Sequence, residues 1–87
     1  MTNLEAIKAE IIYPLPEHSF QKVLADRELN PEESYDPANP KPMELAKADA
    51  IRILVAGPNI SEGGYNISVT EKKELIKLAS GLYGKYG

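Results

Sequence analysis

Hydrophobic residues recur along this chain at the spacing of amphipathic helices, in four separate segments. The first segment opens with Thr2, followed three residues later by Glu5, which is the spacing of a helix capping box. Pro14 and Pro16 end this segment, because proline lacks the amide hydrogen that a continuing helix needs. The pattern therefore predicts a first helix whose apolar stripe consists of Leu4, Ile7 and Ile11.

A second helix is predicted over residues 17–29, and Pro16 suits its first turn. Its apolar side is formed by Phe20, Val23, Leu24 and the aliphatic stem of Arg27. The residues that follow, 30–42, are rich in proline and in acidic side chains, a composition typical of exposed loops. We therefore expect an acidic surface loop between the second and third helices.

The third segment, residues 43–56, begins with strong helix formers and ends in a run, residues 51–55, that strand propensity also favours. Its length favours a helix throughout. The polar positions that we expect on its outer face are Glu44, Lys47, Asp49 and Arg52, and the apolar positions on its inner face are Ala46, Ala50, Ile53 and Leu54.

A fourth helix is predicted to begin within two residues of Thr70, since Ser68 and Thr70 are both good N-cap residues. Its apolar positions cover a wide arc, formed by Leu75, Ile76, Leu78, Ala79, Leu82, Tyr83 and Tyr86. An arc of this width indicates contacts on more than one side of the helix.

Between the third and fourth helices, residues 59–69 have the pattern of a short β-hairpin. Gly63 and Gly64 suit its two-residue loop. This register places four apolar residues on one face, namely Ile60, Tyr65, Ile67 and Val69. A lone two-stranded hairpin is marginally stable in water, so this face would need to pack on the chain's own helices or on another protein.

Together these elements predict a mainly α fold, a single small four-helix domain over residues 1–87, with a short β-hairpin between the third and fourth helices. The chain has 87 residues, of which 43% are hydrophobic and 26% charged, as is ordinary for one soluble globular domain. A chain of this length buries only a modest core, so association with other chains would help to stabilise it.

The net charge of −3 is unevenly distributed along the chain. Residues 1–36 hold eight acids and three bases, whereas residues 37–87 hold five acids and seven bases. This asymmetry has two interpretations, namely solvated faces that happen to differ, or head-to-tail association in which the acidic surface of one copy meets the basic surface of the next. Weak charge patterns of this kind are common, which favours the first interpretation.

Candidate catalytic and metal-binding residues are few. The chain has no cysteine, and its one histidine, His18, lies at a predicted helix start without an evident partner. The loop acids Glu32, Glu33 and Asp36 lack the ligand spacing of a calcium loop. No glycine-rich phosphate loop is present. We therefore expect no catalytic residue, no metal site and no cofactor.

Nucleic acid and membrane are also not expected as partners. Lys72, Lys73 and Lys77 give the predicted fourth helix positive charge, but Glu71 and Glu74 accompany them and the chain as a whole is acidic. The longest apolar run is far shorter than the roughly 20 residues of a membrane span. The acidic first dozen residues do not have the pattern of a signal peptide, so a cytoplasmic location is expected.

The segment NISEGGYNISVTEKKELIKLASGLYGKYG, together with the opening MTNLEAIKAEIIYPLPEHSF and the DREL of residues 26–29, resembles a family of small bacterial and prophage proteins. In its succession of short helices this family is similar to the phage head–tail connector, or adaptor, proteins. The resemblance implies a protein that assembles as a ring between portal and tail, and a virion component where it is phage-encoded.

The sequence therefore predicts a non-enzymatic assembly module that binds copies of itself or other virion proteins. The alternative is a small bacterial adaptor or regulatory protein that binds a partner as monomer or dimer through the end carrying Tyr83 and Tyr86. These two tyrosines have a further interpretation, as edges of the protein's own core. The residues predicted to form protein interfaces are Ile60, Tyr65, Ile67, Val69, Tyr83 and Tyr86.

Overall fold

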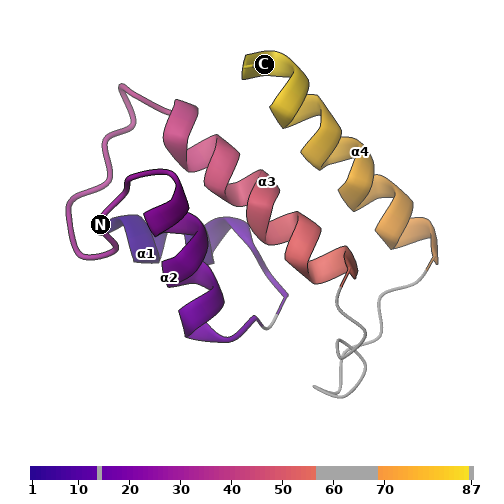
Figure 1. Cartoon of the computed structure of the whole chain (residues 1–87), viewed down its shortest axis with the longest axis horizontal. Coiled ribbons are helices and arrows are strands. Elements are labelled where there is room, and N and C mark those ends of the chain that lie inside the picture. Colours follow the sequence, from indigo (N-terminus) through magenta and orange to yellow (C-terminus); the bar gives the residue numbers. More distant parts are fainter. Residues whose placement is uncertain (14, 57–68, 87) are drawn as a thin grey trace.

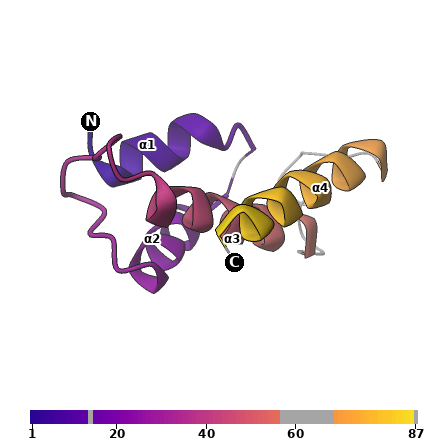
Figure 2. The ribbon, with the colours of Figure 1, turned by 90° about the horizontal axis from the view of Figure 1, so that it is seen from above.

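A computed structural model describes residues 1–13, 15–56 and 69–86 of the chain. These residues form four helices, which are α1 (Asn3–Glu10), α2 (Glu17–Asp26), α3 (Lys41–Ala56) and α4 (Val69–Tyr86). Helices α1 and α2 pack on each other and on α3, while α4 lies beside α3 and antiparallel to it (Figures 1 and 2). The prediction of a mainly α fold is confirmed, and α3 is its central element.

The prediction of a β-hairpin between the third and fourth helices is wrong for the residues that the structure describes. No strand occurs among them, and their β-type pairing is limited to an isolated bridge between Thr2 and Ser34. Residues 59–68 of the predicted hairpin lie outside the described ranges, and its last residue, Val69, begins α4. Good helix formers follow Val69, and extending their helix by one residue outweighs the preference of valine for strands.

The N-terminus of α1 is held by its own cap and by the loop that follows α2. The amide of Glu5 donates to the Thr2 hydroxyl, and the amide of Thr2 donates to the Glu5 carboxylate, so the predicted capping box is confirmed. The amides of Asn3 and Leu4 donate to the carbonyls of Glu33 and Pro31. The acidic loop therefore satisfies backbone groups that the start of a helix leaves unpaired.

Helix α2 ends at Asp26, three residues before the predicted end. The amide of Leu29 donates to the carbonyl of Leu24, and the amide of Glu28 donates to that of Ala25, which is the pattern of a Schellman motif. Glu28 occupies the left-handed position of this motif, with φ of 62°, where glycine is usual. This turn places Arg27 at the end of α2, facing α3.

Helix α3 includes the run at residues 51–55, so the choice of helix over strand is confirmed there. It begins two residues before the predicted start, because proline is tolerated in the first turn of a helix and Pro42 lies there. The core lies between α1, α2 and α3, and its most deeply buried large side chains are Ile7, Val23, Leu24, Ile51 and Leu54.

Helix α4 is attached to one side of this core. Among the described helices it packs on α3 alone. Within residues 70–86 only Ala79 is fully buried, while Leu75, Leu82 and Tyr83 are partly buried against the core. Because α4 has a single helical neighbour, both of its flanks reach the surface.

Candidate functional site

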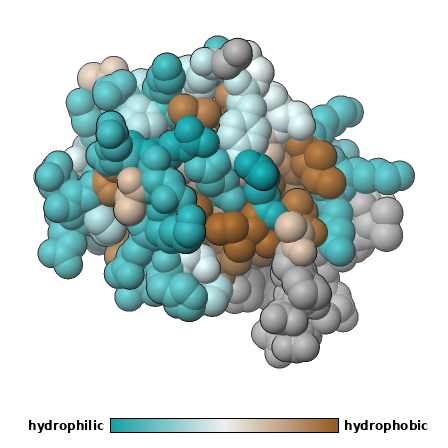
Figure 3. Space-filling model, viewed as in Figure 1, coloured by the Kyte–Doolittle hydropathy of each residue, from teal (hydrophilic) through white to brown (hydrophobic). Residues whose placement is uncertain are grey.

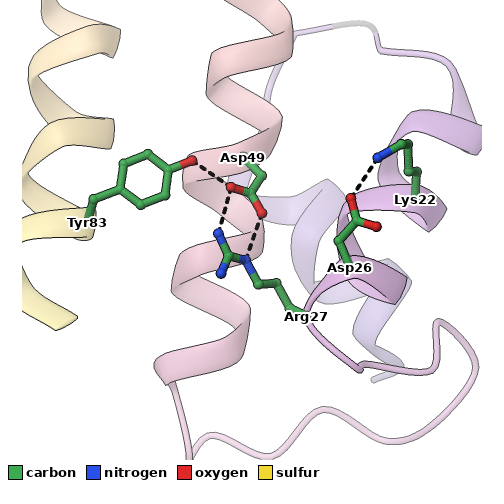
Figure 4. A network of polar contacts seen from close by, with 5 residues as sticks. All are labelled: Lys22, Asp26, Arg27, Asp49 and Tyr83. Atoms are coloured by element: carbon green, nitrogen blue, oxygen red, sulfur yellow. Dashed lines mark hydrogen bonds and ion pairs between the residues drawn. The ribbon is translucent and has the colours of Figure 1, made fainter. Parts of the chain in front are cut away.

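The carboxylate of Asp49 joins α4 to the rest of the molecule (Figure 4). Arg27, at the end of α2, donates from Nε to Oδ2 at 2.8 Å and from Nη2 to Oδ1 at 2.9 Å. The hydroxyl of Tyr83, on α4, donates to Oδ1 at 2.5 Å. A bidentate arginine fixes the position of the carboxylate, which in turn fixes the tyrosine. One α3 side chain thus links the end of α2 to α4.

The electrostatics of this network favour the charged form of Asp49. Burial alone would raise the pKa of Asp49, but the hydrogen bonds from Arg27 and Tyr83 outweigh burial and lower it. Burial raises the pKa of Tyr83, and its hydrogen bond to the Asp49 carboxylate raises it further. At neutral pH the network therefore consists of a carboxylate, a guanidinium and a neutral phenol.

Acidification is expected to remove the stabilisation that Asp49 supplies. Because its folded pKa is lowered, this stabilisation is present above the ordinary pKa of 3.8 and is lost as the pH falls through the folded value. The urea midpoints of the native protein and Asp49→Asn should therefore converge below pH 3.8. A difference that stays constant down to the acid limit would contradict this assignment.

Three further side-chain contacts hold the ends of α4. Near its C-terminus, the Tyr86 hydroxyl donates to Glu44 Oε2 at 2.5 Å, and Lys85 Nζ lies 3.2 Å from the same oxygen. The Tyr86 and Lys85 hydrogen bonds lower the pKa of Glu44. Near the N-terminus of α4, the Tyr13 hydroxyl donates to Glu71 Oε2 at 2.9 Å. Helix α4 is therefore tied by hydrogen bonds at both ends and at Asp49.

The structure describes three of the six sequence-predicted interface residues. Tyr83 and Tyr86 lie on α4 with their hydroxyls bound to carboxylates of α3, so both contact the chain's own body. Val69 begins α4, and the other three, Ile60, Tyr65 and Ile67, lie outside the described residues. His18 is exposed at the start of α2, as expected for a surface histidine.

Asp49 and Glu44 were expected on the outer face of α3, and this expectation is wrong. Both side chains are half-buried, and each carboxylate accepts a hydrogen bond from a tyrosine hydroxyl of α4. The helical period of the sequence placed them opposite the core of α1 and α2, but it could not show that α4 packs on that side. The sequence did contain one signal for these contacts. Tyr83 and Tyr86 are three residues apart on one helix, so their hydroxyls lie on the same side of it and need two hydrogen-bond acceptors on the neighbouring helix.

An apolar groove runs along the side of α4 that faces the end of α1. Its volume is about 240 Å³, and its apolar lining consists of Ile11, Ile12, Tyr13, Ile51, Leu54, Leu75 and Leu78. Two of these side chains are open to solvent, Ile12 with 77% and Leu78 with 44% of its surface exposed. We call this surface the Leu78 flank, formed by Ile12, Tyr13, Glu71, Glu74, Leu75 and Leu78.

A second groove, of about 380 Å³, runs along the opposite side of α4 and is lined by Ile51, Arg52, Val55, Ile76, Ala79, Ser80 and Tyr83. Ile76 is 51% exposed there. We call this surface the Ile76 flank, formed by Arg52, Val55, Lys72, Lys73, Ile76 and Ser80. Figure 3 shows hydrophobic surface over α3 and α4 on one face of the molecule. The wide apolar arc of α4 thus leaves hydrophobic surface on both flanks.

Metal-binding clusters and membrane-spanning helices are two further features that would indicate a function. Residues 1–13, 15–56 and 69–86 contain no group of three or more side chains placed to hold a metal ion. In the same part of the chain, no helix has the length and apolarity to cross a membrane. Exposed large apolar side chains line both flanks of α4, Ile76 on one and Leu78 on the other.

Comparison with known proteins identifies a family for this chain. A model described as a family of unknown function (DUF6706) matches residues 1–87. No curated protein matches the chain, and no solved structure does. Because the match extends over the whole sequence, the chain belongs to the DUF6706 family, whose function is unknown.

Proposed function

We propose that this protein is a non-enzymatic assembly module that associates with copies of itself, in the manner of phage head–tail connector proteins. The observation that carries the proposal is the exposure of large apolar side chains on both flanks of α4. Ile76 and Leu78 are 51% and 44% exposed, although they belong to a helix that packs on α3. Exposed apolar side chains that line grooves are typical of protein interaction surfaces.

The size of the chain supports the same proposal. A domain of 87 residues buries a modest core, and its fourth helix contributes only Ala79 to the fully buried residues within 70–86. Covering Ile76 and Leu78 with another protein would remove apolar surface from water, at about 25 cal/mol per Å². Association would therefore stabilise both the complex and the attachment of α4.

Oligomeric state tests the proposal. Native mass spectrometry and analytical ultracentrifugation, from micromolar to millimolar concentration, should show species larger than the monomer whose fraction rises with concentration. The variant Ile76→Ser/Leu78→Ser should shift this equilibrium towards the monomer, because it removes exposed apolar surface from both flanks. Since neither residue is buried, far-UV circular dichroism should show an unchanged helix content.

A matched control is Ala25→Ser, which changes an exposed residue of α2 that lies outside both flanks and should leave association unchanged. A monomer at every concentration would contradict the assembly proposal. That outcome would favour the alternative, an adaptor that binds a different protein. Equal association of the native protein and the double variant would show that association uses another surface.

A further inference from the structure

The Leu78 flank carries negative charge beside its exposed apolar residues. Glu71 and Glu74 line an open groove with Tyr13, Leu75 and Leu78, so both carboxylates border the apolar surface. Glu71 accepts the Tyr13 hydroxyl, and Glu74 is exposed. Lys47 also lies beside this flank, but its Nζ is 3.1 Å from Oε2 of Glu10, which neutralises its charge. This flank is therefore acidic overall.

The Ile76 flank carries the opposite charge. Arg52, from α3, lines its groove, and its guanidinium carbon lies 5.9 Å from the centre of the Tyr83 ring. Lys72 and Lys73 precede Ile76 by four and three residues, which places them on the same side of α4. Both lysines are exposed and form no ion pair with the described residues. This flank is therefore basic.

Two properties make these flanks complementary to each other. Each presents a partly exposed apolar residue, Leu78 on one and Ile76 on the other, and the charges beside them are opposite in sign. Protein interfaces commonly combine a central apolar contact with charge complementarity at the rim. A contact between two like flanks would instead bring charges of the same sign together, which opposes association.

We propose that copies of this chain associate head to tail, with the Leu78 flank of one copy docked on the Ile76 flank of the next. The inference rests on the proposed assembly function, and it specifies the two surfaces that form the contact. Because the two surfaces differ, the contact is heterologous, and each copy keeps one flank free for a further copy. Such a contact closes into a ring or extends as a filament, depending on the rotation between copies.

Single charge reversals on the two flanks test this arrangement. Lys73→Glu alters the Ile76 flank and Glu74→Lys alters the Leu78 flank, and both residues are exposed. Each variant alone should associate about tenfold more weakly, because an attractive rim contact becomes repulsive. Glu74→Lys lowers the magnitude of the net charge, so its weakening cannot come from general repulsion between acidic chains.

Mixing the two variants gives the decisive result. The Lys73→Glu copy retains a native Leu78 flank, and the Glu74→Lys copy retains a native Ile76 flank, so one native contact forms between them. Sedimentation of the equimolar mixture should show stronger association than either variant alone. Isotope labelling of one variant should show mixed dimers in native mass spectra. Thermal melts followed by circular dichroism check that both variants are folded.

The outcomes separate this inference from the proposed function. A native protein that is monomeric at every concentration would overturn both. A native protein that associates while both reversals leave association unchanged would overturn the flank pairing alone. Stronger association of Glu74→Lys than of the native protein would also overturn it, because the head-to-tail contact requires negative charge on the Leu78 flank. If the mixture associates no more strongly than either variant alone, a head-to-tail contact between these flanks is excluded.

Discussion

Replacing Asp49 by alanine should lower the free energy of unfolding by about 2–3 kcal/mol, a large fraction of the total for a small domain. The substitution leaves the Arg27 guanidinium and the Tyr83 hydroxyl without their shared acceptor. Breaking a fully buried ion pair costs about 3–5 kcal/mol. The expected loss is smaller here because the side chains of Arg27 and Asp49 are 31% and 17% exposed.

The measurement is urea unfolding followed by far-UV circular dichroism, at a concentration low enough to limit association. Asp26→Ala is the matched control, since its carboxylate pairs with Lys22 on an exposed face of α2 and should matter little. Asp49→Asn, which keeps the shape but not the charge, should lie between the native protein and Asp49→Ala. Equal stabilities of the two alanine variants would contradict the role assigned to Asp49.

Leu24→Ala should cost about 3 kcal/mol of unfolding free energy. Leu24 is fully buried, with 0% of its surface exposed, and belongs to the core between α1, α2 and α3. Truncation removes apolar contacts and leaves a cavity that the surrounding helices fill only in part. The same urea experiment measures the loss, which in a domain of this size approaches the limit of stable folding.

Leu78→Ala is the matched control for this substitution, because it makes the same chemical change at a side chain that is 44% exposed. Its effect on monomer stability should be below about 1 kcal/mol. Leu78→Ala should weaken association more than Leu24→Ala does in the folded protein, since Leu78 lies on the proposed contact surface. A cost for Leu78→Ala equal to that for Leu24→Ala would mean that α4 is part of the main core.

Local signals in the sequence predicted the helices well. The capping spacing of Thr2 and Glu5 predicted the start of α1, and the cap residues Ser68 and Thr70 predicted the start of α4 to within two residues of Thr70. These features act over one or two turns, so they can be read without knowledge of the fold. The end of α2 was harder, because a glutamate, Glu28, occupies a position where glycine is the usual signal.

The hairpin prediction rested on alternation and a Gly-Gly pair, and its overlap with α4 shows the limit of such patterns. At Val69, local strand propensity and helix extension compete, and the structure favours the helix. The candidate surfaces likewise depended on packing. The seven apolar residues of α4 indicated contacts on several sides, but not that Ile76 and Leu78 would remain exposed.

By itself the sequence determined four helices, their approximate bounds and a mainly α fold, because capping, periodicity and proline act between neighbouring residues. The tertiary structure alone decided that α4 packs on α3 and on no other described helix, and that Asp49 joins Arg27 to Tyr83. These contacts join residues far apart in the chain. Their formation depends on the orientation of whole helices, which no local pattern encodes.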